Sequence, residues 1–157
     1  MLVIYPGSFD PFTLGHEDIV KRASSSFDEV MLAVSEDNAK SSLFSVSERL
    51  EMAKIIAEKY INVSFATYQG LTVDFAKANN TNFILRGLRD TSDFDSEAQN
   101  ALMNKTMNNS IETIFLISSK NVREISSTNV RQILSLNGDV SNFMSDQIIS
   151  YIKSLKI

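Results

Sequence analysis

The sequence predicts an α/β fold built on one five-stranded parallel sheet. Two observations support this: short apolar runs of strand length recur along the 157 residues, and the segments between them carry apolar residues at helical spacing. Alternating strands and helices form βαβ units, whose right-handed crossovers give a doubly wound, Rossmann-like sheet. The length suits one core and no linker or repeat interrupts the chain, so we expect a single domain over residues 1–157.

Five runs have the composition of buried strands, beginning with LVIY near the amino end and EVMLAV after it. In chain order they lie at residues 2–5, 29–34, 63–67, 83–85 and 114–117. In an open α/β sheet, a ligand binds beyond the carboxyl ends of the strands, where the strand order reverses. A site is therefore expected on the loops after the first, second, fourth and fifth strands.

Six segments have helical periodicity. The first places Ile19, Val20 and Ala23 on one face, and the second follows a capping box formed by Ser45 and Glu48. The expected helices lie at residues 17–26, 47–59, 72–79, 93–108, 128–136 and 146–156.

Composition excludes several classes of protein. Fifteen basic and 19 acidic residues give a net charge of −4 and a pI of about 5.0, which argues against a nucleic-acid partner. No apolar run approaches the ~20 residues that cross a bilayer, and no signal peptide is visible, so we expect no membrane attachment and a cytoplasmic location. With no cysteine and one histidine, thiolate and multi-imidazole metal sites are excluded.

The turn after the first strand has features of a phosphate site. Gly7 and Gly15 would let a phosphate approach the backbone, and Ser8 and Thr13 offer hydroxyl donors. A helix that begins near Gly15 would point free N–H groups into the cleft, and His16, in its first turn, could donate to a phosphate oxygen. The turn matches neither GxGxxG nor the P-loop, and an ordinary Pro-Gly turn with an inert histidine is the alternative.

A second candidate phosphate site follows the fifth strand. Three hydroxyls, from Ser126, Ser127 and Thr128, stand at the start of an expected helix, with Arg131 one turn later. At least one should act as an N-cap, while the others and the helix N-terminus could face the cleft. Arginines are also concentrated in this half of the chain, since four of the six lie between positions 86 and 131. Arg86 and Arg89, after the fourth strand, have the planar fork that suits bidentate phosphate contacts, although they could be loop surface charges.

These segments resemble a known family. Residues 7–11 followed by Thr13, Gly15 and His16 resemble the TxGH motif of nucleotidyltransferases related to class I aminoacyl-tRNA synthetases, and residues 125–131 resemble their ISSxxxR motif. Thr13, RGLR at residues 86–89, the DF pair at 93–94, Glu97 and the Met-Asn pair at 103–104 resemble the phosphopantetheine adenylyltransferase family in particular. The resemblance covers residues 5–143.

The resemblance implies transfer of the AMP moiety of ATP to 4′-phosphopantetheine, giving dephospho-coenzyme A and pyrophosphate. It implies catalytic roles for His16, Lys40 and Arg89. It implies that the acceptor contacts Ser8, Lys40, Thr72 and Arg86. It implies that ATP contacts Ser8, Phe9, His16, Gly87, Leu88, Arg89, Glu97, Val122, Arg123, Glu124, Ile125, Ser126, Ser127 and Thr128. Mg²⁺ should arrive bound to ATP, with no assigned protein ligand, and a homohexamer, a dimer of trimers, is expected.

Three alternatives remain at this point. A related transferase would act on nicotinamide mononucleotide or glycerol phosphate, a regulator on the same fold would bind nucleotide without catalysis, and a tRNA-binding fragment would conflict with the acidic charge. The sequence also departs from the family at residues 118–124, where the usual proline and aromatic residues are missing. The conformation of that loop is the part of the site that the resemblance does not supply.

Overall fold

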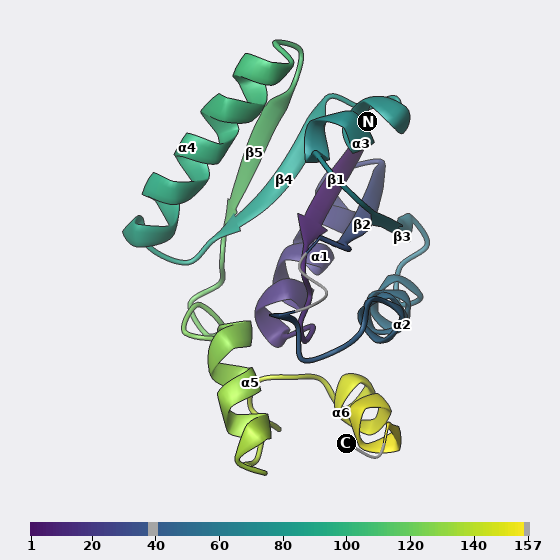
Figure 1. The fold of residues 1–157 in the computed structure, drawn as a ribbon, viewed down its shortest axis with the longest axis vertical. Coiled ribbons are helices and arrows are strands. Elements are labelled where there is room, and N and C mark those ends of the chain that lie inside the picture. Colours follow the sequence, from purple (N-terminus) through teal and green to yellow (C-terminus); the bar gives the residue numbers. More distant parts are fainter. Residues whose placement is uncertain (38–40, 156–157) are drawn as a thin grey trace.

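The sheet has five parallel strands in the order β3-β2-β1-β4-β5, which confirms the predicted doubly wound sheet (Figure 1). The structure is a computed structural model that describes residues 1–37 and 41–155. Its strands are β1 (Leu2–Gly7), β2 (Glu29–Ser35), β3 (Val63–Tyr68), β4 (Phe83–Leu88) and β5 (Glu112–Ile117). The order reverses between β1 and β4, so the expected site belongs at the carboxyl ends of these two strands.

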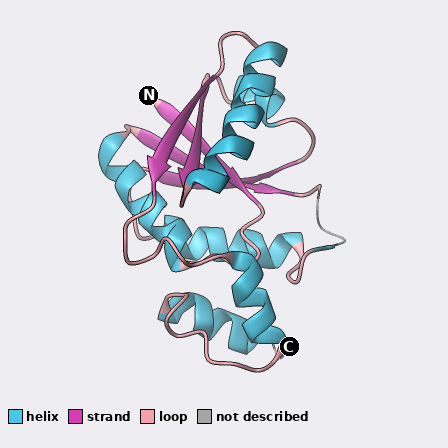
Figure 2. Cartoon of the chain, turned by 90° about the vertical axis from the view of Figure 1, so that its left-hand side faces the viewer, coloured by secondary structure: helices cyan, strands magenta, loops and turns pink. Residues whose placement is uncertain are grey.

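Helices cover both faces of the sheet and its carboxyl end (Figures 1 and 2). They are α1 (Leu14–Ser26), α2 (Val46–Ala57), α3 (Thr72–Ala78), α4 (Thr91–Met107), α5 (Ser127–Ser135) and α6 (Asp146–Ser154). Figure 1 shows α5 and α6 at the end of the molecule opposite the amino terminus, beyond the arrowhead of β1. No helix in the described ranges is both long and apolar enough to cross a membrane.

Side chains alternate between two cores along β1. Val3 and Tyr5 join the larger core, which holds the buried faces of α1 and α2, whereas Ile4 joins a smaller core with Val73 and Ala76 of α3. Alternation with period two is what a strand covered on both faces requires. The buried apolar runs that identified the strands in the sequence therefore reflect helices on both sides of the sheet.

Two helices, α1 and α4, begin more than one residue earlier than the sequence pattern suggested. The apolar pattern of α1 starts at residue 17, but Thr13 has extended backbone and the helix begins at Leu14. The Asp90 carboxylate accepts N–H bonds from Ser92 and Asp93, at 2.9 and 3.1 Å, so α4 begins at Thr91 and not at residue 93. Capping by a polar side chain, not apolar periodicity, sets both starts. The predicted Ser45–Glu48 capping box is confirmed, with reciprocal bonds of 2.7 and 3.3 Å.

The strands part where the site was expected. β1 pairs with β2 over six residues, whereas its pairing with β4 is limited to Ile4 and Ile84. Beyond Ile4 comes Pro6, which brings no N–H to a ladder. The Pro6 carbonyl instead accepts a 2.7 Å hydrogen bond from the Arg86 guanidinium. The divergence of β1 from β4 opens the sheet at its switch point.

Candidate active site

A cavity of about 280 Å³ lies at this opening. The β1 turn, the start of α1, the end of β4, the first turns of α4 and the segment that leads into α5 all contribute to its wall. The wall includes twelve of the residues that the sequence assigned to the site: Ser8, Phe9, His16, Arg86, Gly87, Arg89, Glu97, Val122, Ile125, Ser126, Ser127 and Thr128. Segments far apart in the sequence therefore meet in one hollow, as a doubly wound sheet predicts.

The β1 turn is shaped by a buried aromatic ring. Phe9 has a left-handed backbone (φ 49°) and is 1% exposed, and its ring stacks on Phe12 with centroids 4.7 Å apart. A Cβ at Gly7 would lie 3.0 Å from the Phe9 ring, tighter than most side-chain contacts, so a larger residue at this position would require the ring to move. Phe9 thus supports the turn from within the core, and only part of it borders the cavity.

His16 is a neutral hydrogen-bond donor in this site. The Thr13 backbone N–H donates to Nδ1 at 3.1 Å, so the proton of the neutral ring is on Nε2. Burial, followed by the positive charges of Arg86 and Arg89, lowers the pKa of His16 to about 4. Because His16 lines the cavity, its Nε2–H is available to an oxygen bound there. One expected free donor is absent, since the Leu14 N–H donates to the Phe143 carbonyl at 2.9 Å.

The start of α5 packs directly on the β1 turn. Ser127 donates to the Pro11 carbonyl at 3.0 Å, and Arg131 donates to the Asp10 carbonyl at 2.6 Å. Of the three hydroxyls expected to provide an N-cap, Ser126 does so, and its hydroxyl accepts the Asn129 N–H at 3.2 Å. The two motifs from opposite ends of the chain are therefore adjacent. Arg131 itself does not border the cavity, because its guanidinium is held by Asp10 and by the Thr128 hydroxyl.

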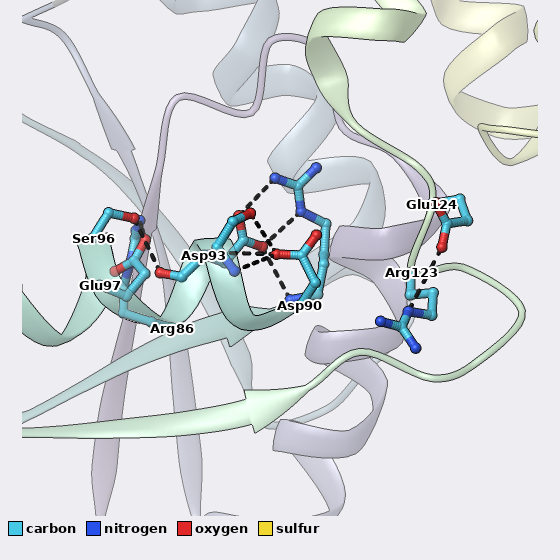
Figure 3. Close-up of polar contacts among 9 residues, drawn as sticks. Arg86, Asp90, Asp93, Ser96, Glu97, Arg123 and Glu124 are labelled. Atoms are coloured by element: carbon cyan, nitrogen blue, oxygen red, sulfur yellow. Dashed lines mark hydrogen bonds and ion pairs between the residues drawn. The ribbon is translucent and has the colours of Figure 1, made fainter.

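Both arginines at the end of β4 are paired with carboxylates of α4. Arg86 donates through Nε and Nη2 to Glu97, at 2.8 and 2.5 Å, and Figure 3 shows the two side chains facing each other. Arg89 donates in the same way to Asp93, at 2.8 and 2.9 Å. The bidentate edge that was expected to face a phosphate is thus occupied in each case. Burial would lower the pKa of Arg86, but the Glu97 pair outweighs it and raises the pKa, so the guanidinium stays charged.

Four predicted site residues that the structure describes do not appear in the cavity wall. Thr72 begins α3 and its hydroxyl lies 3.1 Å from that of Tyr68, away from the cavity. The Leu88 side chain is buried. Arg123 and Glu124 are exposed and form an ion pair at 3.7 Å, which Figure 3 shows on the loop beyond α4. Lys40 lies outside the described residues.

Two wall residues were missed by the sequence analysis. Tyr5 and Ile19 had been read only as a strand residue and a core-facing helix residue, yet both border the cavity. Burial raises the pKa of the Tyr5 phenol, which therefore keeps its proton and can donate. The strand period gave a usable signal, since a tyrosine near the carboxyl end of the strand before the switch point places a hydroxyl at the site.

The carboxylates of the wall do not form a metal site. Asp93 and Glu97 are each bonded to an arginine, and among the described residues no three His, Asp or Glu side chains gather closely enough to hold an ion. Cations and hydrogen-bond donors prevail in the cavity wall: two guanidinium groups, a neutral imidazole, a phenol and six serine or threonine hydroxyls. This chemistry suits a polyphosphate.

Comparison with known proteins identifies the family. The model of cytidylyltransferase-like proteins matches residues 4–133. A phosphopantetheine adenylyltransferase from Azoarcus sp. is 44% identical over 97% of this chain and 93% of its own length, and one from Desulfitobacterium hafniense is 45% identical over 94% and 90%. A Plasmodium falciparum nicotinic acid mononucleotide adenylyltransferase, solved with NaAD, shares the fold with a TM-score of 0.74 at 19% identity, over 99% of this chain and 96% of its own. The chain belongs to the phosphopantetheine adenylyltransferase family of cytidylyltransferase-like proteins.

Proposed function

We infer that this protein transfers the AMP moiety of ATP to 4′-phosphopantetheine, releasing pyrophosphate and forming dephospho-coenzyme A. The observation that carries the inference is the meeting of His16, the two β4 arginines and the start of α5 around one cavity. The relatives that are 44 and 45% identical bear the name of this activity. The cytoplasm, where ATP is plentiful, is the compartment we propose.

The reaction needs no protein base. An oxygen of the acceptor phosphate, already anionic, attacks the α-phosphorus of ATP in line. The bond from that phosphorus to the bridging oxygen breaks, and pyrophosphate leaves with the electron pair. Catalysis then consists of positioning and of stabilising the charge that develops on the α-phosphate oxygens. The Nε2–H of His16, the arginines and the N-terminus of α5 are suited to that charge.

We propose that Mg²⁺ enters the site bound to the phosphates of ATP. Asp93 and Glu97 are both engaged by arginines, so the described residues provide no carboxylate cage for a divalent cation. Mg²⁺ commonly binds through substrate phosphates and keeps several waters. The ion would therefore be held by ATP, and it would neutralise part of the triphosphate charge.

Product analysis tests the substrate assignment. The fold does not discriminate, because the structural neighbour at 19% identity is a nicotinic acid mononucleotide adenylyltransferase. Mass spectrometry after incubation of ATP with each acceptor in turn should detect dephospho-coenzyme A from 4′-phosphopantetheine. Efficient dinucleotide formation from nicotinamide mononucleotide, with no product from 4′-phosphopantetheine, would refute the assignment, and nucleotide binding without any product would indicate a regulator.

We propose that Arg86 and Lys40 serve the acceptor phosphate. The hydrogen bonds to Glu97 and to the Pro6 carbonyl use three of the five N–H groups of Arg86, so two remain for a phosphate without loss of the ion pair. The Glu97 pair then holds the guanidinium in place while its free edge binds.

Replacing Arg86 with Ala should weaken the binding of 4′-phosphopantetheine by about tenfold or more and the binding of ATP much less, because a charge-assisted contact to the acceptor is lost. Lys40→Ala should behave likewise. Steady-state KM values for both substrates measure this. Glu97→Gln is the control. It weakens the contact that holds the Arg86 guanidinium but keeps the guanidinium itself. If Glu97 contacts ATP, this variant should lose more affinity for ATP than for 4′-phosphopantetheine. Equal rises in KM for both substrates in Arg86→Ala would show that Arg86 does not serve the acceptor phosphate in particular.

A homohexamer is proposed from the surface of α4. No residue of this helix is buried, and Leu102 and Met103 are 68 and 63% exposed, as is Ile117 of the neighbouring strand β5 at 70%. An exposed apolar surface of this kind marks an interface, and a second copy of the chain is the occupant that the family resemblance implies.

Light scattering should report a particle of six 17.5 kDa chains. Leu102→Glu should shift the protein to smaller species, because burial of the new carboxylate in the interface is unfavourable. Ile61→Glu is the matched control, since Ile61 is fully exposed in the turn before β3 and should leave the assembly intact. A parent protein that is monomeric at micromolar concentration would contradict the proposal.

A further inference from the structure

The segment 118–124 is attached to α1 by an acidic side chain. Asp18, two residues after His16, accepts the Ser119 hydroxyl through Oδ1 at 2.6 Å and the Ser119 backbone N–H through Oδ2 at 3.0 Å. This segment contains no proline or aromatic residue, so its composition does little to restrict its backbone. Its conformation must come from such contacts.

A second side chain of α1 completes the attachment. Arg22, one turn after Asp18, donates to Asp18 Oδ2 at 3.2 Å and to the Ile117 carbonyl at 2.5 Å. The residues on both sides of Ser118 are thus tied to α1. Ser118 lies in the cavity wall, and its N–H donates to the Leu88 carbonyl at 2.8 Å.

The anchor at Ser119 also determines where the rest of the segment lies. The Val122 N–H donates to the Ser119 carbonyl and the Ile125 N–H donates to the Val122 carbonyl, each at 3.1 Å. These linked turns carry Val122 and Ile125 into the cavity wall. The far end returns to α1, because a Cβ at Gly15 would lie 3.6 Å from the Ile125 carbonyl oxygen. A shift at Ser119 would therefore move the wall as far as the start of α5.

Asp18 remains ionised under physiological conditions. Partial burial would raise its pKa, but the hydrogen bonds from Ser119 and Arg22 outweigh the burial and hold the pKa below its usual range. Hydrogen bonds to a charged acceptor are stronger than neutral ones. The carboxylate is thus a strong acceptor at the pH where the enzyme works.

We propose that Asp18 is a positioning residue for ATP: through Ser119 it holds segment 118–125 as the wall against which the nucleotide binds. This rests on the proposed function, which places ATP at Val122, Ile125 and the start of α5. Asp18 need not touch ATP. Asp18 aligns the wall with His16, because Asp18 and His16 belong to the same turn of α1.

The test compares Asp18→Asn, Ser119→Ala and the double variant with Glu17→Gln. Glu17 is a matched control: it precedes Asp18 on α1, its side chain is 15% exposed against 16%, and its partner is Lys59, which is remote from the loop. Asp18→Asn and Ser119→Ala should each raise the KM for ATP by about tenfold. Their KM for 4′-phosphopantetheine and their thermal midpoints should match those of Glu17→Gln. The double variant should be no worse than Asp18→Asn, because both changes remove one interaction.

Other results would overturn the proposal. Additive losses in the double variant, or equal rises in both KM values, would show that Asp18 does not act on ATP through Ser119. If Asp18→Asn does not fold, Ser119→Ala still decides, since it removes one hydroxyl and leaves the backbone bond. The affinity for ATP, measured by calorimetry without acceptor, separates a failure of the proposed function from a failure of the positioning role of Asp18. An inactive parent whose ATP affinity still depends on Asp18 would refute the proposed function alone, and an active parent with unchanged ATP affinity in the variants would refute the positioning role alone.

Discussion

Replacing His16 with Ala should reduce turnover by ~10²–10³-fold, the scale observed when one preorganised donor is removed from an active site. The affinity for ATP, measured by calorimetry without acceptor, should change far less. The reason is that charge builds on the α-phosphate oxygens only as the reaction proceeds. A donor that strengthens its bond in the transition state lowers the barrier without tightening the ground state.

The structure adds a second consequence that the sequence did not predict. The His16 ring makes edge contacts with Phe9 and Phe12, each with centroids 5.2 Å apart, and Nδ1 caps the first turn of α1. His16→Ala should therefore also lose stability, about 1 kcal/mol for the cap alone. A decrease in activity would then need to be separated from a decrease in folded protein.

Two conservative variants make that separation. His16→Asn keeps an acceptor near the Nδ1 position and removes the Nε2–H, so it should fold better than the Ala variant and be about as inactive. His16→Gln places an amide N–H near the Nε2 position and should recover part of the turnover. Equal activity of the Asn variant and the parent would show that the ring caps the helix and has no role in catalysis.

The pH dependence of stability gives an independent readout. The folded-state pKa of His16, about 4, lies below the ordinary value of 6.5. Between these values the unfolded chain takes up a proton that the folded protein does not, so stability falls as the pH drops from about 6.5 toward 4. His16→Asn should lack this component, and its stability relative to the parent should rise over the same range. A constant difference between the two proteins in urea titrations would contradict the assignment of His16 as neutral in the folded protein.

The sequence was sufficient for the fold because the strand signals are strong. Runs such as residues 2–5 and 29–34 are short, apolar and bounded by turns. Helices cover both faces of the sheet, so a strand inside it is apolar on both sides, as these runs are. The ends of elements were predicted less well, since Thr13 and Asp90 extend α1 and α4 by local capping that apolar periodicity does not register. Topology then brought the TxGH-like turn and the start of α5 together, as expected.

The sequence did not predict which polar side chains of the site pair with each other. Arg86 and Glu97 are eleven residues apart, and nothing in their spacing indicates that the carboxylate occupies the edge expected to bind phosphate. The same limit applies to Thr72, whose place in the wall depended on resemblance and whose hydroxyl lies beside Tyr68. Long polar side chains select partners by three-dimensional position, which a one-dimensional pattern does not contain.

Arg49 shows this limit most clearly. The helix pattern of α2 treats a charged residue as solvated, yet Arg49 is 0% exposed. A signal was present, because Arg49, Ala53 and Ile56 share one face at spacings of four and three, and that face is the buried one. Its guanidinium donates to the carbonyls of Ser8, Ser35 and Phe44, at 2.7, 2.8 and 3.2 Å. One cation thus joins the β1 turn, the end of β2 and the segment before α2.

A buried carboxylate depends on the same arrangement. Asp10 is 3% exposed and accepts the N–H groups of Leu43 and Phe44, both at 2.9 Å. Burial lowers the pKa of Arg49, while the negative charges of Asp10 and Glu36 act in the opposite direction. Arg131, at 3.6 Å, is the basic side chain within ion-pair distance of Asp10 among the described residues, and Arg49 adds a positive charge at longer range.

Arg49→Met should therefore lower the free energy of unfolding by about 3 kcal/mol, because an apolar side chain of similar length fills the space but leaves three carbonyls without their donor and removes a positive charge from the surroundings of Asp10. Arg49→Lys, which keeps the charge and part of the hydrogen bonding, should lose less. Lys54→Met is the control on the same helix, since Lys54 is 40% exposed and pairs with an exposed Glu51, and it should change little. Urea titrations at one fixed protein concentration measure the differences, and each kcal/mol should also lower the thermal midpoint by roughly 2–4 °C. If Arg49→Met were as stable as Lys54→Met, the three Arg49 hydrogen bonds would contribute nothing measurable to folding, and the β1 turn would have to be held in place by its aromatic packing and by its contacts with α5 and with the segment before α2.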